Sequence, residues 1–276
     1  MSRLLSTRTR FAFRRRGRPA PVLGACLPFL AILGLALSAS PQRVKNFSTP
    51  TPLPPTSTLI VGFGATQNAA GTLPQPPYRL AVRLRALALP GVFVETIESS
   101  MFGMAQGFLL AATGRNSKGV CGSDGCREVR FIFYGYGDGA AEMLKAIRKL
   151  KSIGLPVALA VEITNAGGCG GVIPSNVVRA ANICLDERWA DHGRKQIRAE
   201  DPATTQILAN LRASSEGRWL DISQATQEHP KLRYHDLHTE LDPIVWNHVE
   251  DYILDELHRA GIPGAPAPPH PVLPPL

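Results

Sequence analysis

Residues 135–139, Gly-Tyr-Gly-Asp-Gly, have the glycine spacing of a turn that presents a nucleophile, but they lack the nucleophile itself. They follow a short apolar run, Val129–Tyr134, and precede a helix-like stretch that ends at Leu150. A sharp turn between a strand and a helix is the setting in which Gly-x-Ser-x-Gly exposes a serine hydroxyl for attack. The flanking glycines are needed because the strand and the helix pass close to each other. The central position here is Gly137, so the turn is predicted and its reacting atom is missing.

The segments around this turn alternate between strand-like and helix-like patterns. Short apolar runs of strand length are Thr58–Phe63, Gly91–Ile97, Val129–Tyr134 and Pro156–Ile163. Helical stretches are expected at about 78–88, 101–112 and 139–152, and a last helix from Pro243 to about His258, with Asp242 as its N-cap. Strands that are apolar throughout and alternate with helices indicate a parallel sheet covered on both faces.

Three polar segments are expected to meet at the carboxyl edge of this sheet, where chemistry gathers in open parallel folds. The first is the turn at 135–139. The second is the end of the next strand, Glu162–Asn165, which precedes a glycine-rich loop. The third is a loop that contains His238, just ahead of the last helix.

This arrangement resembles the α/β-hydrolase superfamily, in particular its lipase-like or thioesterase-like bacterial members. The resemblance covers about residues 58–258 and rests on the order of turn, strand end and loop histidine. It also rests on the stretch PVALAVEITNAGG…IPSNVVRAANIC, which looks like the family segment where a strand ends in the triad aspartate and a Pro–Asn segment follows. The resemblance implies an α/β-hydrolase-like fold, a mostly parallel sheet with helices on both faces.

The resemblance implies catalytic roles for three positions. It puts the nucleophile at Gly137, the acid at Asn165 and the general base at His238. Only the histidine has the required chemistry, because glycine offers no atom for attack and asparagine no charge to stabilise an imidazolium. The leading interpretation is therefore a pseudoenzyme that binds a small molecule or a protein ligand. The alternative is an active esterase or thioesterase with an unrecognised nucleophile.

Asp138 has three further interpretations. The family's oxyanion hole is built from backbone, so the amide of Asp138 would survive together with that of Gly64 or Ala65. Its carboxylate would be the nucleophile if the chain resembled dehalogenases or epoxide hydrolases, but this shift of frame puts Tyr136 where a small residue is needed. A third interpretation makes Asp138 the N-cap of the helix that follows.

A second alternative function is dinucleotide binding. Residues 60–67, IVGFGATQ, follow a strand and look like the start of a dinucleotide-binding fingerprint, with Glu95 as the acid on the next strand. Gln67 replaces the third glycine of that fingerprint, and the prolines at 74, 76 and 77 interrupt the helix that should follow. We therefore expect no cofactor.

The positive charge of the chain lies near its N-terminus. The net charge is +8, and residues 1–40 contain seven arginines and no acid, so the remainder carries only +1. A basic stripe for nucleic acid is therefore not indicated. The arginines precede an apolar run, Pro21–Ala39, which has the pattern of an export signal with small residues at Ala36-Leu37-Ser38. At 19 residues the run is also long enough to remain as a membrane anchor, so the protein is expected to be periplasmic, secreted or membrane-tethered.

Composition divides the chain into four parts. Residues 1–40 are the expected signal peptide or anchor, and residues 41–57, rich in Pro, Ser and Thr, are an expected linker. The hydrolase-like domain is expected over 58–260. Residues 261–276 are predicted to be a Pro-rich disordered tail.

Four cysteines follow the apolar run, namely Cys121, Cys126, Cys169 and Cys184. An even number in an oxidising compartment permits disulfides, and Cys121 and Cys126 enclose a short loop that a disulfide would close. Zinc would favour tighter paired spacings, and His235-x-x-His238 has no matched ligand cluster elsewhere, so no metal site is predicted.

Overall fold

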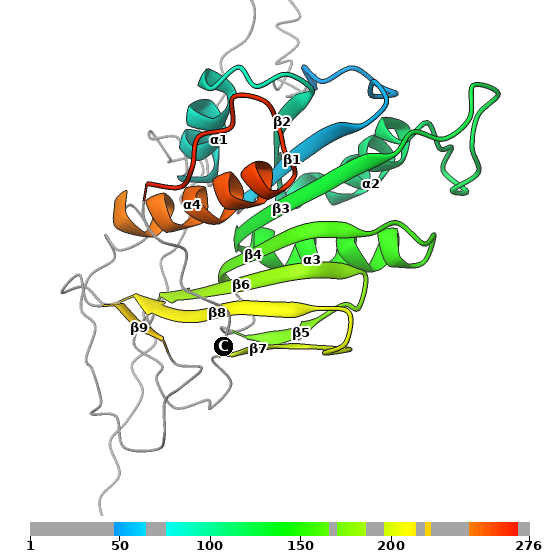
Figure 1. Ribbon diagram of the computed structural model, residues 1–276. Coiled ribbons are helices and arrows are strands. Elements are labelled where there is room, and N and C mark those ends of the chain that lie inside the picture. Colours follow the sequence, from blue (N-terminus) through cyan, green and yellow to red (C-terminus); the bar gives the residue numbers. More distant parts are fainter. Residues whose placement is uncertain are drawn as a thin grey trace, which may run out of the picture. The chain divides into compact units, whose positions relative to one another are not determined.

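A seven-stranded sheet in the order β2-β1-β3-β4-β6-β8-β9 forms the centre of the computed structural model (Figure 1). The structure describes residues 47–64, 76–165, 170–185, 196–213, 219–221 and 243–269, all within the unit that runs from Asn46 to Leu276. The strands are β1 (Ser57–Gly64), β2 (Val92–Glu98), β3 (Val129–Gly137), β4 (Val157–Asn165), β6 (Val177–Leu185), β8 (Gln206–Ala213) and β9 (Trp219–Asp221). The first six are parallel, and β9 pairs antiparallel to β8.

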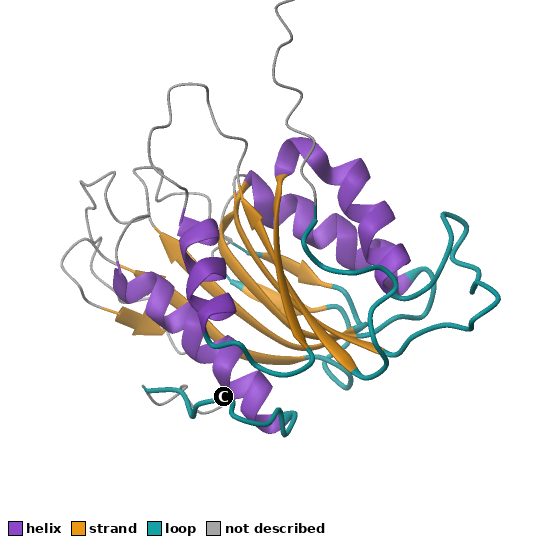
Figure 2. Ribbon diagram, turned by 90° about the horizontal axis from the view of Figure 1, so that it is seen from above, coloured by secondary structure: helices purple, strands orange, loops and turns teal. Residues whose placement is uncertain are grey.

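Helices cover both faces of this sheet (Figure 2). The α1 helix (Pro76–Ala86) and the α4 helix (Pro243–Arg259) pack on one face, and α2 (Phe102–Ala112) and α3 (Asp138–Lys151) pack on the other. A 3₁₀ turn, Ser99–Met101, leads into α2, and β5 (Gly171–Ile173) and β7 (Ile197–Ala199) form a separate two-stranded sheet. The predicted α/β architecture, a mostly parallel sheet between two helical layers, is confirmed.

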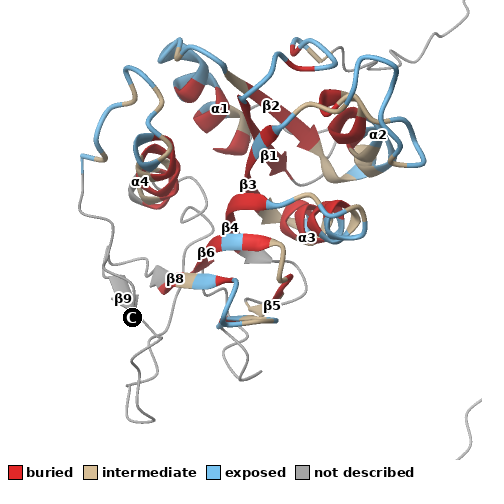
Figure 3. Ribbon diagram, turned by 45° about the vertical axis from the view of Figure 1, so that its right-hand side comes forward, coloured by how far each residue is buried: buried red, intermediate tan, exposed pale blue. Residues whose placement is uncertain are grey.

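The central strands are buried on both sides, as continuous apolar runs require (Figure 3). Tyr134 on β3 is fully buried, and its hydroxyl donates a 2.8 Å hydrogen bond to the carbonyl of Pro77 on α1. Its ring lies against β1 at Gly62, where an added Cβ would come within 2.3 Å of the Tyr134 Cζ atom. The glycine on β1 is therefore required by the tyrosine on β3.

Residues 47–56, which the sequence places in a linker, lie against the domain. The ring of Phe47 stacks on that of Phe108 with 4.1 Å between centroids. Leu53 is 1% exposed, and its backbone amide donates a 2.9 Å hydrogen bond to the carbonyl of Ala112. Apolar side chains between the prolines thus hold this segment on the helix α2 side of the sheet.

The segment after α4 also packs against the domain, although the sequence predicts disorder from residue 261. Gly261, at φ 69°, ends the helix, and the Ile262 amide donates to the Leu257 carbonyl at 3.1 Å. Ile262 and Ala265 contact the apolar cluster beneath α1 and α4, and the described backbone continues to Pro269.

None of the helices that the structure describes is both long and apolar enough to cross a membrane. The apolar run Pro21–Ala39 lies outside the described residues.

Candidate functional site at the carboxyl edge of the sheet

The turn between β3 and α3 is centred on Gly137. Gly137 is the last residue of β3 and the N-cap of α3, with φ 59° and ψ −128°. Glycine adopts this conformation without steric cost, whereas a residue with a side chain would be strained in it. The positive φ that favours glycine therefore falls at the position that the sequence assigns to a nucleophile.

The two flanking glycines are required by contacts with the backbone. A Cβ built on Gly135 would lie 2.6 Å from the Cα of Ala140, so β3 and α3 pass too close for a side chain. A Cβ on Gly139 would lie 2.3 Å from the carbonyl oxygen of Phe63 at the end of β1. Shifting the frame by one residue would put Tyr136 and Ala140 in these roles, but the tight contacts fall at 135 and 139.

The strand ends bring three of the sequence-predicted site residues together. Gly64 ends β1, and its carbonyl carbon would be 2.8 Å from a Cβ on Gly139. Asn165 ends β4 and is the register partner of Gly137. The backbones of Gly64, Gly137 and Asn165, with the first turn of α3, therefore lie at one edge of the sheet. Ala65 and His238 lie outside the described residues, as does the Asn165 side chain.

Asp138 is the first residue of α3 and is exposed. The N-cap is Gly137, and no side chain forms a capping hydrogen bond, so the interpretation of Asp138 as N-cap is wrong. The reason is that β3 extends through Gly137, which moves the helix start one residue earlier than a cap at 138 would require. In the first turn, the carboxylate still interacts favourably with the positive end of the helix dipole.

An aromatic contact borders the turn on the α4 side, and the sequence patterns did not reveal it. The rings of Tyr136 and Trp246 meet edge to face, with 6.0 Å between centroids. Arg83 on α1 donates a 3.2 Å hydrogen bond to the Trp246 carbonyl and forms a 2.7 Å ion pair with Glu250. Burial raises the pKa of Glu250 above its ordinary value, although the Arg83 charge acts in the opposite direction.

A row of buried polar side chains crosses β4, β6 and β8. Glu162 is the register partner of Asn182, which in turn is the register partner of Asn210. All three are at most 4% exposed. Asn210 Oδ1 accepts a 3.3 Å hydrogen bond from Asn182 Nδ2 and a 2.7 Å hydrogen bond from the Ile197 amide, which fastens β7 to the sheet. In the sequence, the only sign of this row is a polar residue inside each of three apolar strands.

The dinucleotide interpretation requires Glu95 to be available for a ribose. Glu95 is inside β2, three residues before its end, and is 3% exposed. Its Oε1 accepts hydrogen bonds from the Thr49 amide at 2.9 Å, the Thr49 hydroxyl at 2.7 Å and the Ser48 hydroxyl at 2.9 Å. This carboxylate binds the N-terminal segment, which argues against a role in cofactor binding.

A disulfide joins Cys121 and Cys126, whose Cα atoms are 5.0 Å apart. They lie in the loop between α2 and β3, which projects beyond the sheet (Figure 1). Cys184 on β6 is also disulfide-bonded, whereas Cys169 is outside the described residues. Within the described ranges no group of three or more His, Cys, Asp or Glu side chains is placed to hold a metal ion. His235 lies outside these ranges.

Comparison with known proteins adds little to this geometry. No family model matches the sequence. No curated protein matches it either. Among solved structures, the chain is similar to a novel cutinase-like protein from Cryptococcus sp., with 17% identity and a TM-score of 0.28 over 46% of this chain. The alignment spans 63% of the length of that chain. Likeness at this level carries no argument about activity.

Proposed function

We propose that the chain is an α/β-hydrolase-fold protein without a side-chain nucleophile, which binds a ligand at the carboxyl edge of its sheet. The observation that carries the proposal is the position of Gly137. It lies at a positive φ in a sharp turn between a strand and a helix, flanked by two glycines whose Cβ positions are filled by backbone. This is the setting of a nucleophile elbow, and the central residue offers only hydrogen.

The backbone around Gly137 supports binding of an oxygen-bearing ligand. The amide of Asp138 belongs to the first turn of α3, where amides have no partner within the helix. The α3 helix is 14 residues long, and its N-terminus points a positive dipole end at the same edge. The backbone at Gly64, the end of β1, would also contribute to binding a carbonyl or carboxylate oxygen there. No side chain at the turn would then attack the bound ligand. The ligand would be retained rather than cleaved.

Labelling with a fluorophosphonate probe tests this proposal. The wild-type protein should remain unlabelled, because it presents no activated hydroxyl at the turn. Gly137→Ser should introduce detectable labelling, whereas the matched control Asp138→Ser should not, since its hydroxyl lies one residue beyond the centre of the turn. Strong labelling of the wild type would overturn the proposal.

A working hydrolase that uses Asp138 is the second candidate function, because this carboxylate is exposed beside the turn. It predicts turnover of epoxide, haloalkane or short-chain ester substrates that Asp138→Asn abolishes. The positive φ at Gly137, the centre of the turn, and the bulk of Tyr136 favour the first proposal. Turnover by the wild type that survives Asp138→Asn would exclude Asp138 as the nucleophile.

Export of the protein is part of the first proposal. It is supported by the arginine-rich start and the apolar run Pro21–Ala39, and by the disulfides, which are typical of oxidising compartments. N-terminal sequencing of protein from its native host should find a start after about Ser38, or an anchored form in the membrane fraction. A soluble cytoplasmic product that begins at Met1 would contradict it.

A further inference from the structure

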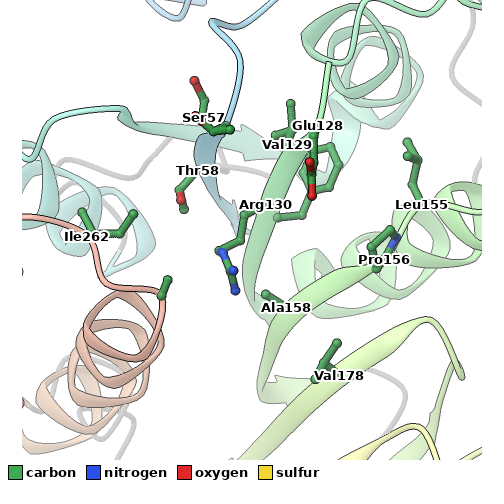
Figure 4. Close-up of a pocket in the computed structure, with 13 residues that line it drawn as sticks. Ser57, Thr58, Glu128, Val129, Arg130, Leu155, Pro156, Ala158, Val178 and Ile262 are labelled. Atoms are coloured by element: carbon green, nitrogen blue, oxygen red, sulfur yellow. The ribbon is translucent and has the colours of Figure 1, made fainter. Parts of the chain in front are cut away.

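A cavity of about 470 Å³ lies at the amino edge of the sheet, at the end of the strands opposite to Gly137. The first residues of β1, β3, β4 and β6 form its floor, and the segment after α4 forms one wall (Figure 4). The volume is within the usual range for sites that bind small molecules. The cavity shares no lining residue with the candidate site at the carboxyl edge.

Arg130 supplies unused hydrogen-bond donors to this cavity. Its Nη1 donates to Glu256 Oε1 at 3.1 Å, and no other partner of Arg130 occurs in the described part of the chain. Glu256 is also bound by Arg179, which in turn pairs with Asp255, and Asp255 pairs with Arg259. Three arginines therefore share two carboxylates, which leaves this cluster with one positive charge. A guanidinium with free donors is the side chain best suited to bind a carboxylate.

Thr58 adds a second polar group beside Arg130. The two residues are register partners on β1 and β3, so they lie next to each other on the same face of the sheet. Thr58 is 1% exposed, and its hydroxyl has no hydrogen-bond partner within the described ranges. The Thr58 hydroxyl and the Arg130 guanidinium both point toward the cavity in Figure 4.

The remaining walls are mostly apolar. Ile262 stands on one side, and Pro156, Ala158 and Val178 lie on the other. Val178 is 50% exposed, which is unusual for a large apolar side chain on a strand that is otherwise buried, and a ligand would cover it. Glu128 is exposed at the rim and disfavours a second negative charge on the ligand.

We propose that this cavity binds an aliphatic monocarboxylate. The carboxylate accepts hydrogen bonds from the Arg130 guanidinium and the Thr58 hydroxyl, and the alkyl chain lies against Ile262, Ala158 and Val178. The site is independent of Gly137, because the two lie at opposite edges of the sheet.

Calorimetric titration of the purified full-length protein with octanoate tests the proposal. Saturable binding is expected for octanoate, and none for octan-1-ol, which has the same chain without the charge. Arg130→Gln should weaken binding at least tenfold. Thr58→Val, which keeps the side-chain size, should weaken it severalfold. The matched control Arg148→Gln removes an exposed arginine on α3 and should leave binding unchanged.

Folding of the variants must be measured as well. Arg130 pairs with Glu256 on α4, so the Arg130→Gln change can perturb this helix. Thermal unfolding should show that Thr58→Val remains folded, so this variant tests the site even if Arg130→Gln does not fold. Absence of octanoate binding to the wild type would overturn the proposal. Equal binding by the wild type and a folded Thr58→Val or Arg130→Gln variant would also overturn it.

Discussion

Gly137 at the end of β3 is the register partner of Asn165 at the end of β4. The register shifts by one residue between Tyr136 and Gly137, and this irregularity places Gly137 beside Asn165 rather than beside Thr164. The two positions that the family resemblance assigns to nucleophile and acid are thus adjacent at the same sheet edge. Both carry residues that cannot perform those roles.

Restoring both residues should produce more reactivity than the two single changes predict. Gly137→Ser supplies a hydroxyl, and Asn165→Asp supplies the anion that orients and stabilises an imidazole, an effect of about 10⁴-fold in related chemistry. Triad members act as a unit, so the fluorophosphonate labelling rate of the double variant should exceed the product of the single effects. A folded double variant that does not label would remove the main support for pairing Gly137 and Asn165 with His238.

The glycines around the turn should differ sharply from a surface glycine in their tolerance of alanine. Gly139→Ala would drive a Cβ into the Phe63 backbone, which cannot move as a side chain can, so unfolding free energy should fall by about 3 kcal/mol or more. Gly107 is exposed on α2, and a Cβ added there would have no heavy atom within 4 Å, so Gly107→Ala should gain up to about 1 kcal/mol. Urea denaturation measures both. Equal effects of the two changes would contradict the close approach of α3 to β1.

The turn at residues 135–139 could be predicted from the sequence because the contacts that require its glycines are mostly between neighbouring segments of the chain. A strand, a turn and a helix that follow one another fix the close contacts of Gly135 directly, and the apolar runs fix the parallel sheet. The order β2-β1-β3-β4-β6-β8 brings segments together that the chain separates widely. Glu95 therefore looked like a ribose-binding acid, although Thr49, 46 residues earlier, binds it.

Composition was a weaker guide at the ends of the domain. Proline-rich flanks were interpreted as a linker and a disordered tail, but single apolar residues within them pack in or against the core. Leu53 and Ile262 are such residues, and both contact apolar clusters. Likewise, the hydrogen bond from the Ile197 amide to Asn210 could not be predicted from the sequence. Ile197 is on β7, which belongs to a different sheet from the strand that carries Asn210.

The disulfide between Cys121 and Cys126 should contribute modestly to stability. It closes a loop with only four residues between the cysteines, so the entropy it removes from the unfolded chain corresponds to about 1–3 kcal/mol. Replacing both cysteines by serine should lower the unfolding free energy by that amount and leave the fold intact. Mass spectrometry of unreduced, exported protein should find the crosslinked peptide, and four free thiols would contradict both the pairing and the oxidising compartment.

Stability should depend on pH through Asp255, which anchors the end of α4. Burial raises the pKa of Asp255, but hydrogen bonds from Arg259 Nε at 2.8 Å and Arg179 Nη1 at 2.9 Å outweigh it and hold the pKa below its ordinary value of 3.8. Between the folded-state pKa and 3.8, the unfolded chain binds more protons than the folded one, so stability rises with pH there. The contribution is complete above 3.8 and is lost as the pH falls through the folded-state pKa.

Comparison of the wild type with Asp255→Asn isolates this effect, because both retain Glu250, whose raised pKa acts in the opposite sense. The difference in unfolding free energy between the two proteins should be constant above about pH 5 and should shrink as the pH falls below 3.8. Arg259→Gln removes one of the two hydrogen-bond donors and should therefore move this loss to higher pH. A difference that grows on acidification would show that Asp255 is stabilised as the neutral acid, and that its pairing with Arg179 does not hold α4 in place.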